Sequence, residues 1–326
     1  MEPPNGLIAH FLVAALLVLP ACGNGGSESE SGLPADVASL TAVQLLGKKI
    51  FEDTNLSEPP GQACSSCHDS DHAFTGNNGS RIPAIALGSR PEVFGNRNAP
   101  TVMYAMFSPA FSLGAERNDD GTIEYTPTGG QFWDGRATNL AEQAKKPFLN
   151  TREMNNPSAA AVIAKVRVSS YADLFGSVYG SDAFDDVDAA YDRLARAVAA
   201  FEQNSRFHPF SSKFDDYLRG RAKLDPVEAR GFELFKDPRK GNCIACHVGD
   251  ETSRQPRDWL FTDYTYDNLG IPRNTHIPDN DDPSFFDLGL CQQDGLAARA
   301  PRGLDVERLC GAFKVPTLRN VELTAP

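Results

Sequence analysis

Cys64-Ser65-Ser66-Cys67-His68 recurs later in the chain as Cys243-Ile244-Ala245-Cys246-His247. A Cys-x-x-Cys-His string is the attachment signature of a c-type haem, because two thiols can form thioethers to the porphyrin edge while the adjacent imidazole binds the iron. Zinc sites and redox dithiols are the alternatives. A structural zinc site gathers its ligands within one short module, whereas these pairs lie far apart. The sequence therefore predicts two covalently bound haem c groups, with the attachment residues Cys64, Cys67, His68, Cys243, Cys246 and His247.

Length and charge restrict the class of protein. The chain has 326 residues, which is enough for two domains with a core each. It carries 31 Lys and Arg against 43 Asp and Glu, a formal net charge of −12. This balance disfavours nucleic-acid binding and would attract a cationic partner, such as a small basic electron carrier.

Three of the seven cysteines lie outside the haem strings. Cys22 belongs to the N-terminal segment, while Cys291 and Cys310 flank an irregular loop. We expect the latter two to form a disulfide, with two separate buried thiols as the alternative. Covalent haem attachment takes place on the outer side of the bacterial cytoplasmic membrane, which is compatible with a disulfide.

The N-terminus has the pattern of an export signal. Residues 7–19 form an apolar run of signal-peptide length, which ends in Leu19-Pro20-Ala21-Cys22-Gly23 and resembles a lipoprotein cleavage box. We therefore expect an export or lipoprotein signal over residues 1–22, a flexible tether over 23–33, and a periplasmic protein anchored through lipidated Cys22. Pro20 and the lack of Lys or Arg in residues 1–6 leave a plain secretory signal as the alternative.

The periodicity of apolar residues predicts a mainly α fold. Helices are expected over residues 34–51, 140–145, 158–169, 187–203 and 226–235. No run of alternating apolar residues predicts a sheet. Residues 69–130 form a long irregular stretch, for which haem could serve as a packing partner.

The helices before the two haem strings share a pattern. Gly47-x-x-Ile50-Phe51-x-Asp53 matches Gly231-x-x-Leu234-Phe235-x-Asp237, so each haem string is part of an internal repeat. The pattern is also that of a helix packed beside each haem. A domain boundary is expected near residues 210–220.

Residues 131–154 combine many functional residue types. Gln131-Phe132-Trp133-Asp134-Gly135-Arg136-Ala137 is followed by Gln143, Pro147 and Asn150-x-x-Glu153-Met154. Together with the haem strings and Phe313-Lys314-Val315-Pro316-Thr317-Leu318-Arg319-Asn320, this block resembles the bacterial di-haem cytochrome c peroxidase family, which includes the maturation enzyme of methylamine dehydrogenase. The resemblance extends from about residue 45 to residue 326.

The resemblance implies two cytochrome c-like domains with unequal haems. Residues 34–215 would form the peroxidatic domain, with His68 as proximal ligand, and residues 216–326 the electron-transfer domain, with His247. Glu153 matches the family's distal acid and base, and Gln143 matches its hydrogen-bonding partner. Two further matches are the pocket-shaping Pro147 and Trp133, which would lie between the haems.

The resemblance also implies one Ca²⁺ between the haems. Asn98 would bind it through its side chain, and Thr324 and Pro326 through backbone carbonyls, which suits a hard cation.

The implied reaction is the reduction of hydrogen peroxide with electrons from a small cytochrome c or a cupredoxin. A distal carboxylate can move a proton between the two peroxide oxygens, and an amide can hold the peroxide. One alternative is a di-haem oxidase that modifies Trp or Tyr residues of a partner protein. The maturation enzyme has a Trp before its second haem string where this chain has Gly241-Asn242, which disfavours that alternative. The other alternative is a non-catalytic electron-transfer cytochrome. The sequence leaves open whether the protein forms a homodimer.

The chain departs from the family pattern at two places. Classical members carry a His that caps the peroxidatic iron, whereas residues 73–98 contain none and His72 lies too close to His68 to reach the opposite face. We therefore expect an open distal position. The chain also stops at Thr324-Ala325-Pro326, where the family continues, so we expect an incomplete C-terminal domain. His276 could cap the second iron, but a solvated loop His is the more usual case.

Overall fold

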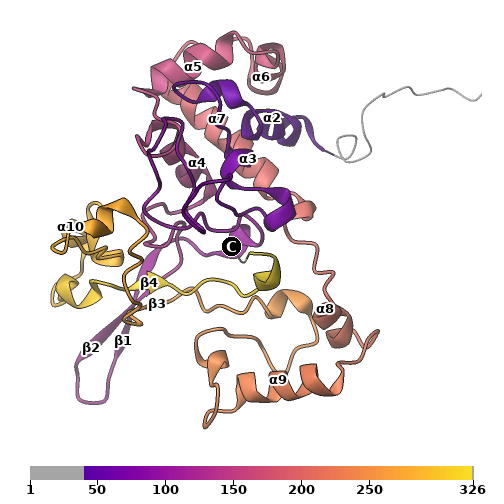
Figure 1. Ribbon diagram of the computed structural model, residues 1–326, viewed down its shortest axis with the longest axis vertical. Helices are drawn as coiled ribbons and strands as arrows, with labels where there is room; N and C mark the ends of the chain where they lie inside the picture. Colours follow the sequence, from indigo (N-terminus) through magenta and orange to yellow (C-terminus); the bar gives the residue numbers. More distant parts are fainter. Residues whose placement is uncertain (1–39, 325–326) are drawn as a thin grey trace, which may run out of the picture. The chain divides into compact units, whose positions relative to one another are not determined.

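The computed structural model describes residues 40–324, whose arrangement is drawn in Figure 1. The expected signal, Cys22, the tether and Pro326 lie outside the described residues. So does the beginning of the helix expected over residues 34–51.

The predicted mainly α fold is confirmed for the described residues, and the predicted helices match within a few residues. The helices before residue 210 are α2 (Ala42–Phe51), α3 (Cys64–Cys67), α4 (Leu140–Leu149), α5 (Ala159–Arg167), α6 (Ala172–Tyr179) and α7 (Val187–Glu202). Those after it are α8 (Lys213–Leu218), α9 (Pro226–Lys236) and α10 (Leu296–Arg299). Helices α3, α6, α8 and α10 were not predicted from the sequence.

Capping residues explain where the helices begin. Helix α2 begins at Ala42 rather than earlier, because the Thr41 side chain and the Gln44 side chain form a capping box. Asp225 forms the corresponding box with Glu228 at the start of α9, where Pro226 occupies the first turn as expected.

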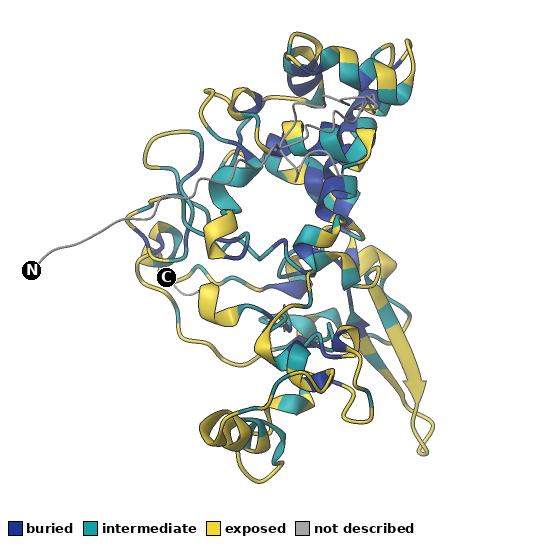
Figure 2. Ribbon diagram, turned by 90° about the vertical axis from the view of Figure 1, so that its right-hand side faces the viewer, coloured by how far each residue is buried: buried dark blue, intermediate teal, exposed yellow. Residues whose placement is uncertain are grey.

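A single large apolar core joins α2, α4, α5, α6 and α7 (Figure 2). Its largest fully buried side chains include Phe51, Phe148, Phe175 and Phe201. Helix α9 differs, since none of its residues is buried within the described part of the chain. The two members of the sequence repeat are therefore packed differently: Gly47 lies in a tight helix contact, whereas an added Cβ at Gly231 would meet nothing within 4 Å.

Gly47→Ala is expected to destabilise the protein by about 1–3 kcal/mol, because the added methyl group overpacks the α2–α7 contact. Its Cβ would lie 1.9 Å from the carbonyl oxygen of Ala197 and 2.9 Å from Cβ of Phe201. Chemical unfolding followed by circular dichroism measures the change. Gly231→Ala is the matched control, and it should leave stability equal or higher by about 0.5–1 kcal/mol. Equal stability of both variants would contradict the tight contact.

Two short antiparallel sheets correct the prediction that the chain has no strands. Strand β1 (Ser112–Arg117) pairs with β2 (Ile123–Thr128), and β3 (Tyr266–Asp267) pairs with β4 (Phe313–Lys314). The β1–β2 hairpin extends away from the helices in Figure 1 and is exposed along most of its length, so it has no apolar alternation to detect.

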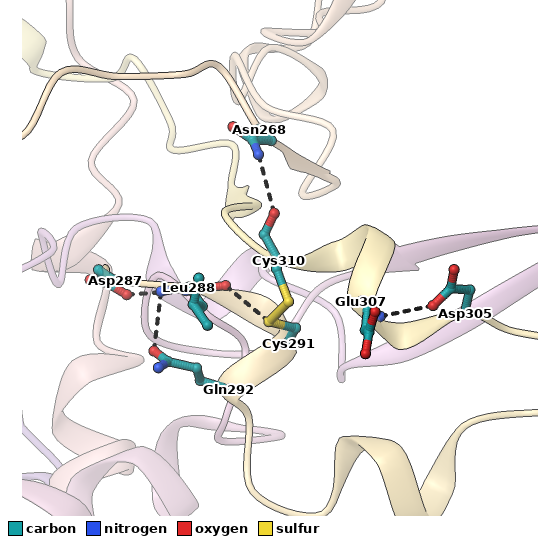
Figure 3. The surroundings of a disulfide bond; sticks show 9 residues. Asn268, Asp287, Leu288, Cys291, Gln292, Asp305, Glu307 and Cys310 are labelled. Atoms are coloured by element: carbon teal, nitrogen blue, oxygen red, sulfur yellow. Dashed lines mark hydrogen bonds between the residues drawn. A yellow bond between two sulfur atoms is a disulfide. The ribbon is translucent and has the colours of Figure 1, made fainter. Parts of the chain in front are cut away.

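The expected disulfide is present between Cys291 and Cys310, whose Cα atoms lie 4.7 Å apart (Figure 3). It closes a loop that is anchored at one end by Asn268, whose side-chain amide donates to the carbonyl oxygen of Cys310 at 3.1 Å. A disulfide of this kind belongs to an oxidising compartment. Among residues 40–324, no helix is long and apolar enough to cross a membrane.

Candidate functional site

A cavity next to the first haem string contains most of the predicted site. His68 and Cys67 line it, together with the predicted site residues Asn98, Trp133, Gln143, Pro147 and Glu153. These residues come from α3, from the long loop before Trp133, from α4 and from the turn after α4.

Both haem-string histidines are oriented in the same way. Nδ1 of His68 donates to the carbonyl oxygen of Phe74 at 3.0 Å, and Nδ1 of His247 donates to that of Phe261 at 3.0 Å. This bond fixes the tautomer and keeps Nε2 available for a metal. Burial lowers the pKa of His68, which favours the neutral, metal-binding form of its imidazole. The geometry therefore fits c-type haem at both strings.

The cysteine environment argues against a zinc site. Cys64, Cys67, Cys243 and Cys246 form no disulfide. Among residues 40–324, no group of three or more His, Cys, Asp or Glu side chains could hold a metal ion. The four thiols are thus free, as thioether formation to haem requires.

Helix α4 positions the amide of the site. Gln143 and Pro147 are four residues apart and thus lie on one face of the helix. Because proline has no N–H, the carbonyl oxygen of Gln143 loses its helical partner at Pro147. The helix nevertheless continues to Leu149 before Asn150 ends it.

Glu153 follows α4 in a turn that holds its side chain. Asn150 Nδ2 donates to Glu153 Oε1 at 2.6 Å, a contact that the sequence analysis did not identify. Burial raises the pKa of Glu153, while the positive charge of Arg136 and the Asn150 hydrogen bond oppose this effect. A carboxyl group with a raised pKa in a cavity is suited to proton transfer near neutral pH.

An ion-pair network that was missed from the sequence supports the cavity wall. Asp134 lies 2.6 Å from Arg97 and 2.8 Å from Arg136, and Arg97 also pairs with Asp287 at 2.7 Å. Asp134 is 5% exposed. Arg97 and Arg136 line the cavity, and guanidinium groups there suit carboxylates such as haem propionates. The Asp134-Gly135-Arg136 string was the only sequence signal of this network.

A second cavity shares Asn98 and Trp133 with the first. Trp133 therefore lies between the two cavities, and its Nε1 donates to the carbonyl oxygen of Asn98 at 2.9 Å. Residues 314–319 of the second family motif also line this cavity. Cys243, Cys246 and His247 are not among its lining residues.

The predicted calcium ligands are partly brought together. Asn98 and Thr324 both line the second cavity, while Pro326 lies outside the described residues. Asn98 Nδ2 donates to the carbonyl oxygen of Ala84 at 3.0 Å, and its Oδ1 accepts no hydrogen bond from residues 40–324. A carboxamide oxygen of this kind fits a hard cation.

Neither His72 nor His276 lines either of these two cavities. His72 pairs with Asp69 at 3.0 Å, and more than half of its side chain is exposed. His276 is exposed in its loop. Within the described residues, His68 is the sole histidine that lines the first cavity.

Two oriented histidines, each next to a thiol pair, and a carboxyl and an amide in the cavity of one of them define a c-type haem oxidoreductase. A family model described as di-haem cytochrome c peroxidase matches residues 41–223. The chain belongs to this family, and it is a cytochrome c peroxidase-like oxidoreductase. Membership implies two c-type haems.

Curated relatives carry both kinds of name found in the family. The chain is 36% identical over 318 residues to the methylamine utilization protein MauG of Paracoccus denitrificans, covering 97% of this chain and 75% of that one. It is 31% identical over 284 residues to cytochrome c551 peroxidase of Nitrosomonas europaea, covering 86% and 66%.

Solved structures agree with the fold. The diheme peroxidase BthA of Burkholderia thailandensis superposes with a TM-score of 0.78 and 38% identity. The match covers 86% of this chain and 66% of that one, so this chain spans slightly less than two thirds of its length.

Proposed function

We propose that this protein reduces hydrogen peroxide to water with electrons from a small cytochrome c or a cupredoxin. The observation that carries the proposal is that Glu153, Gln143 and His68 line one cavity. A buried carboxyl group in such a cavity is costly unless it has a task.

The chain's own residues supply geometry and proton transfer. The bound haems would supply the redox chemistry, including the electrons stored between donor and peroxide. Glu153 accepts a proton from one peroxide oxygen and returns it to the other. The Gln143 amide orients the peroxide, and Asn150 holds Glu153 in place through the 2.6 Å contact. Trp133 lies on the path of electrons between the peroxidatic domain and the electron-transfer domain.

The partner-modifying activity is the second candidate. It is favoured by the 36% identity to a protein named for methylamine utilization. Gly241-Asn242, before the second haem string, counts against it. A non-catalytic electron-transfer cytochrome is the third candidate, and the Glu153–Gln143 pair counts against that one.

One mixing experiment separates the candidates. The full-length holoprotein is combined with hydrogen peroxide, with and without a reduced small cytochrome c or cupredoxin, while donor oxidation and the haem spectrum are followed. Rapid catalytic donor oxidation supports the peroxidase. A peroxide-induced spectral change that persists without donor turnover favours modification of a partner protein. If peroxide causes no reaction at all, the non-catalytic electron-transfer cytochrome is the remaining candidate.

The first haem is expected to have an open distal position as isolated, because no histidine other than His68 lines the described part of its cavity. The absorption and electron paramagnetic resonance spectra of the oxidised protein should therefore contain a high-spin component. Peroxide should also react without prior reduction. A purely six-coordinate low-spin spectrum contradicts this prediction.

Further features of the proposal concern organisation and location. Residues 34–215 form the peroxidatic domain and residues 216–326 belong to the electron-transfer domain. Asn98, Thr324 and Pro326 bind Ca²⁺. The protein is exported to the periplasm, with Cys22 as its lipid anchor, and whether it is a monomer or a homodimer stays open. Metal analysis, membrane fractionation and light scattering of the full-length protein test these features separately.

A further inference from the structure

Glu202 is a buried carboxyl group to which the proposed mechanism assigns no role. It is the last residue of α7, it is 5% exposed, and it lines the same cavity as Glu153 and His68. Its carboxyl group forms no hydrogen bond or ion pair with another residue of the described part of the chain. Its oxygens are not among the fully enclosed unpartnered atoms of the described residues, so the carboxyl group is open to the cavity that it lines.

The local structure disfavours a negative charge at this position. The last turn of α7 contains no basic residue, and the negative end of the helix dipole lies there. Burial raises the pKa of Glu202 to about 8. The group is therefore mostly protonated at neutral pH and can act as a proton donor, at a position where packing alone would favour an apolar side chain.

The helix packing fixes the position of Glu202 in the cavity wall. The neighbouring Phe201 ring packs against Phe51 at 5.5 Å and Phe207 at 5.0 Å between ring centroids. The Phe51 ring in turn lies 6.3 Å from that of His68. Gly47 allows α2 to approach α7 closely beside Ala197 and Phe201, one residue before Glu202.

Glu202 and Glu153 both lie within electrostatic reach of the first haem string. The pKa of Cys64 is raised first by burial, then by the Glu202 carboxyl, and more weakly by Glu153. Cys64 is one of the two predicted thioether positions, so Glu202 lies near the residues that would attach the first haem. The cavity thus has two carboxyl groups, of which only Glu153 has an amide partner.

We propose that Glu202 is a proton-relay residue that delivers protons from solvent to the cavity during peroxide reduction. This inference rests on the proposed peroxidase function. Hydrogen peroxide, two electrons and two protons give two molecules of water, and the electrons come from the reduced small redox protein. Glu153 only moves a proton between the two oxygens, so both protons of the balance must enter from outside. The Glu202 carboxyl gives its proton to the oxygen being reduced and is reprotonated from solvent, once for each proton.

Glu202→Gln tests the relay, because it keeps the shape of the side chain and removes the transferable proton. We expect peroxide-dependent oxidation of a reduced cytochrome c to slow by roughly 10²-fold. The ratio of rates in H₂O and D₂O should rise above that of the wild type, because proton delivery then limits the rate. Glu202→Asp should restore part of the rate. Glu52→Gln, an exposed position at the end of the neighbouring helix α2, is the matched control and should keep the wild-type rate.

An infrared difference spectrum gives a readout that does not depend on turnover. Subtracting Glu202→Gln from wild-type holoprotein at neutral pH should leave the carbonyl band of a protonated carboxyl group. The haem absorption spectra of both proteins should match, which shows that the pocket is intact. Lack of the band, or a Glu202→Gln rate within twofold of wild type with an unchanged isotope ratio, overturns the relay. Lack of turnover by the wild type itself overturns the peroxidase function and the relay with it.

Discussion

Glu153→Gln is expected to lower peroxide-dependent donor oxidation by about 10²- to 10⁴-fold, the usual contribution of a positioned general acid and base. The substitution keeps a side chain of the same shape in the cavity beside Gln143 but removes the group that exchanges a proton with peroxide. Stopped-flow measurement of donor oxidation in the holoprotein gives the rate. The resting haem spectrum should stay unchanged, because Glu153 is not a predicted iron ligand.

The pH dependence of the wild type gives a second test of the same residue. Glu153 must be ionised to accept the proton of peroxide, and burial raises its pKa above the ordinary value of 4.5. On acidification, the rate of donor oxidation should therefore begin to fall at a pH above 4.5. This acidic decrease in the pH–rate profile, called the acidic limb below, should be absent in Glu153→Gln. Glu142→Gln, an exposed position on α4, is the control and should keep both the rate and the acidic limb. If Glu153→Gln oxidised the donor at the wild-type rate, the Glu153 carboxylate would have no role in proton transfer.

Local features were predictable from the sequence because their signals lie within a few residues. The two Cys-x-x-Cys-His strings, the cap at Asp225 and the Gln143–Pro147 spacing are all of this kind. The grouping of Glu153 with His68 is different, since the two residues are far apart in the chain. It could be expected only through the family resemblance. In the structure, both residues line the same cavity.

Features that depend on distant contacts were missed for a physical reason. Arg97 and Asp287 are 190 residues apart, and nothing in either local sequence indicates the other. The β1–β2 hairpin is stabilised by backbone pairing rather than by an apolar face, so it lacks periodicity. Glu202 ends an amphipathic helix, where a charged residue usually lies in solvent. Only the packing of α7 shows that this one is buried.

Asp215 and Arg319 form a further long-range contact, and it is the most completely buried ion pair of the described residues. The Arg319 Nη1 atom lies 2.8 Å from Asp215 Oδ1, and the two side chains are 4% and 0% exposed. Arg319 also donates to the carbonyl oxygens of Trp259 and Pro256, both at 2.8 Å. Its guanidinium lies over the rings of Tyr104, Phe210 and Phe261. The ion pair thus joins α8, which contains Asp215, to the motif of residues 313–320, which contains Arg319.

Asp215→Ala is expected to destabilise the protein by about 3–5 kcal/mol, because it leaves the buried Arg319 charge without its partner. Asp215 Oδ2 also accepts from the Ser212 backbone N–H and hydroxyl, so the substitution removes one half of the capping box of α8 as well. Ser212→Ala removes the other half, the hydroxyl that accepts from the Asp215 backbone N–H, and should cost about 1 kcal/mol while leaving the Asp215–Arg319 pair in place. Asp216→Ala removes an exposed charge on the same helix and should change stability by less than about 1 kcal/mol.

Chemical unfolding of the four holoproteins, wild type and the three variants, gives the differences in unfolding free energy. The distinguishing result is the order: Asp215→Ala should lose several times more stability than Ser212→Ala, and Asp216→Ala should lose least. This order follows from solvation. When an exposed charge is removed, water solvates the partner left behind, but water cannot reach the Arg319 guanidinium, whose side chain is 4% exposed. If Asp215→Ala lost no more than Ser212→Ala, the carboxylate would matter only as a helix cap. Arg319 would then be held by its two carbonyl acceptors and the aromatic rings alone.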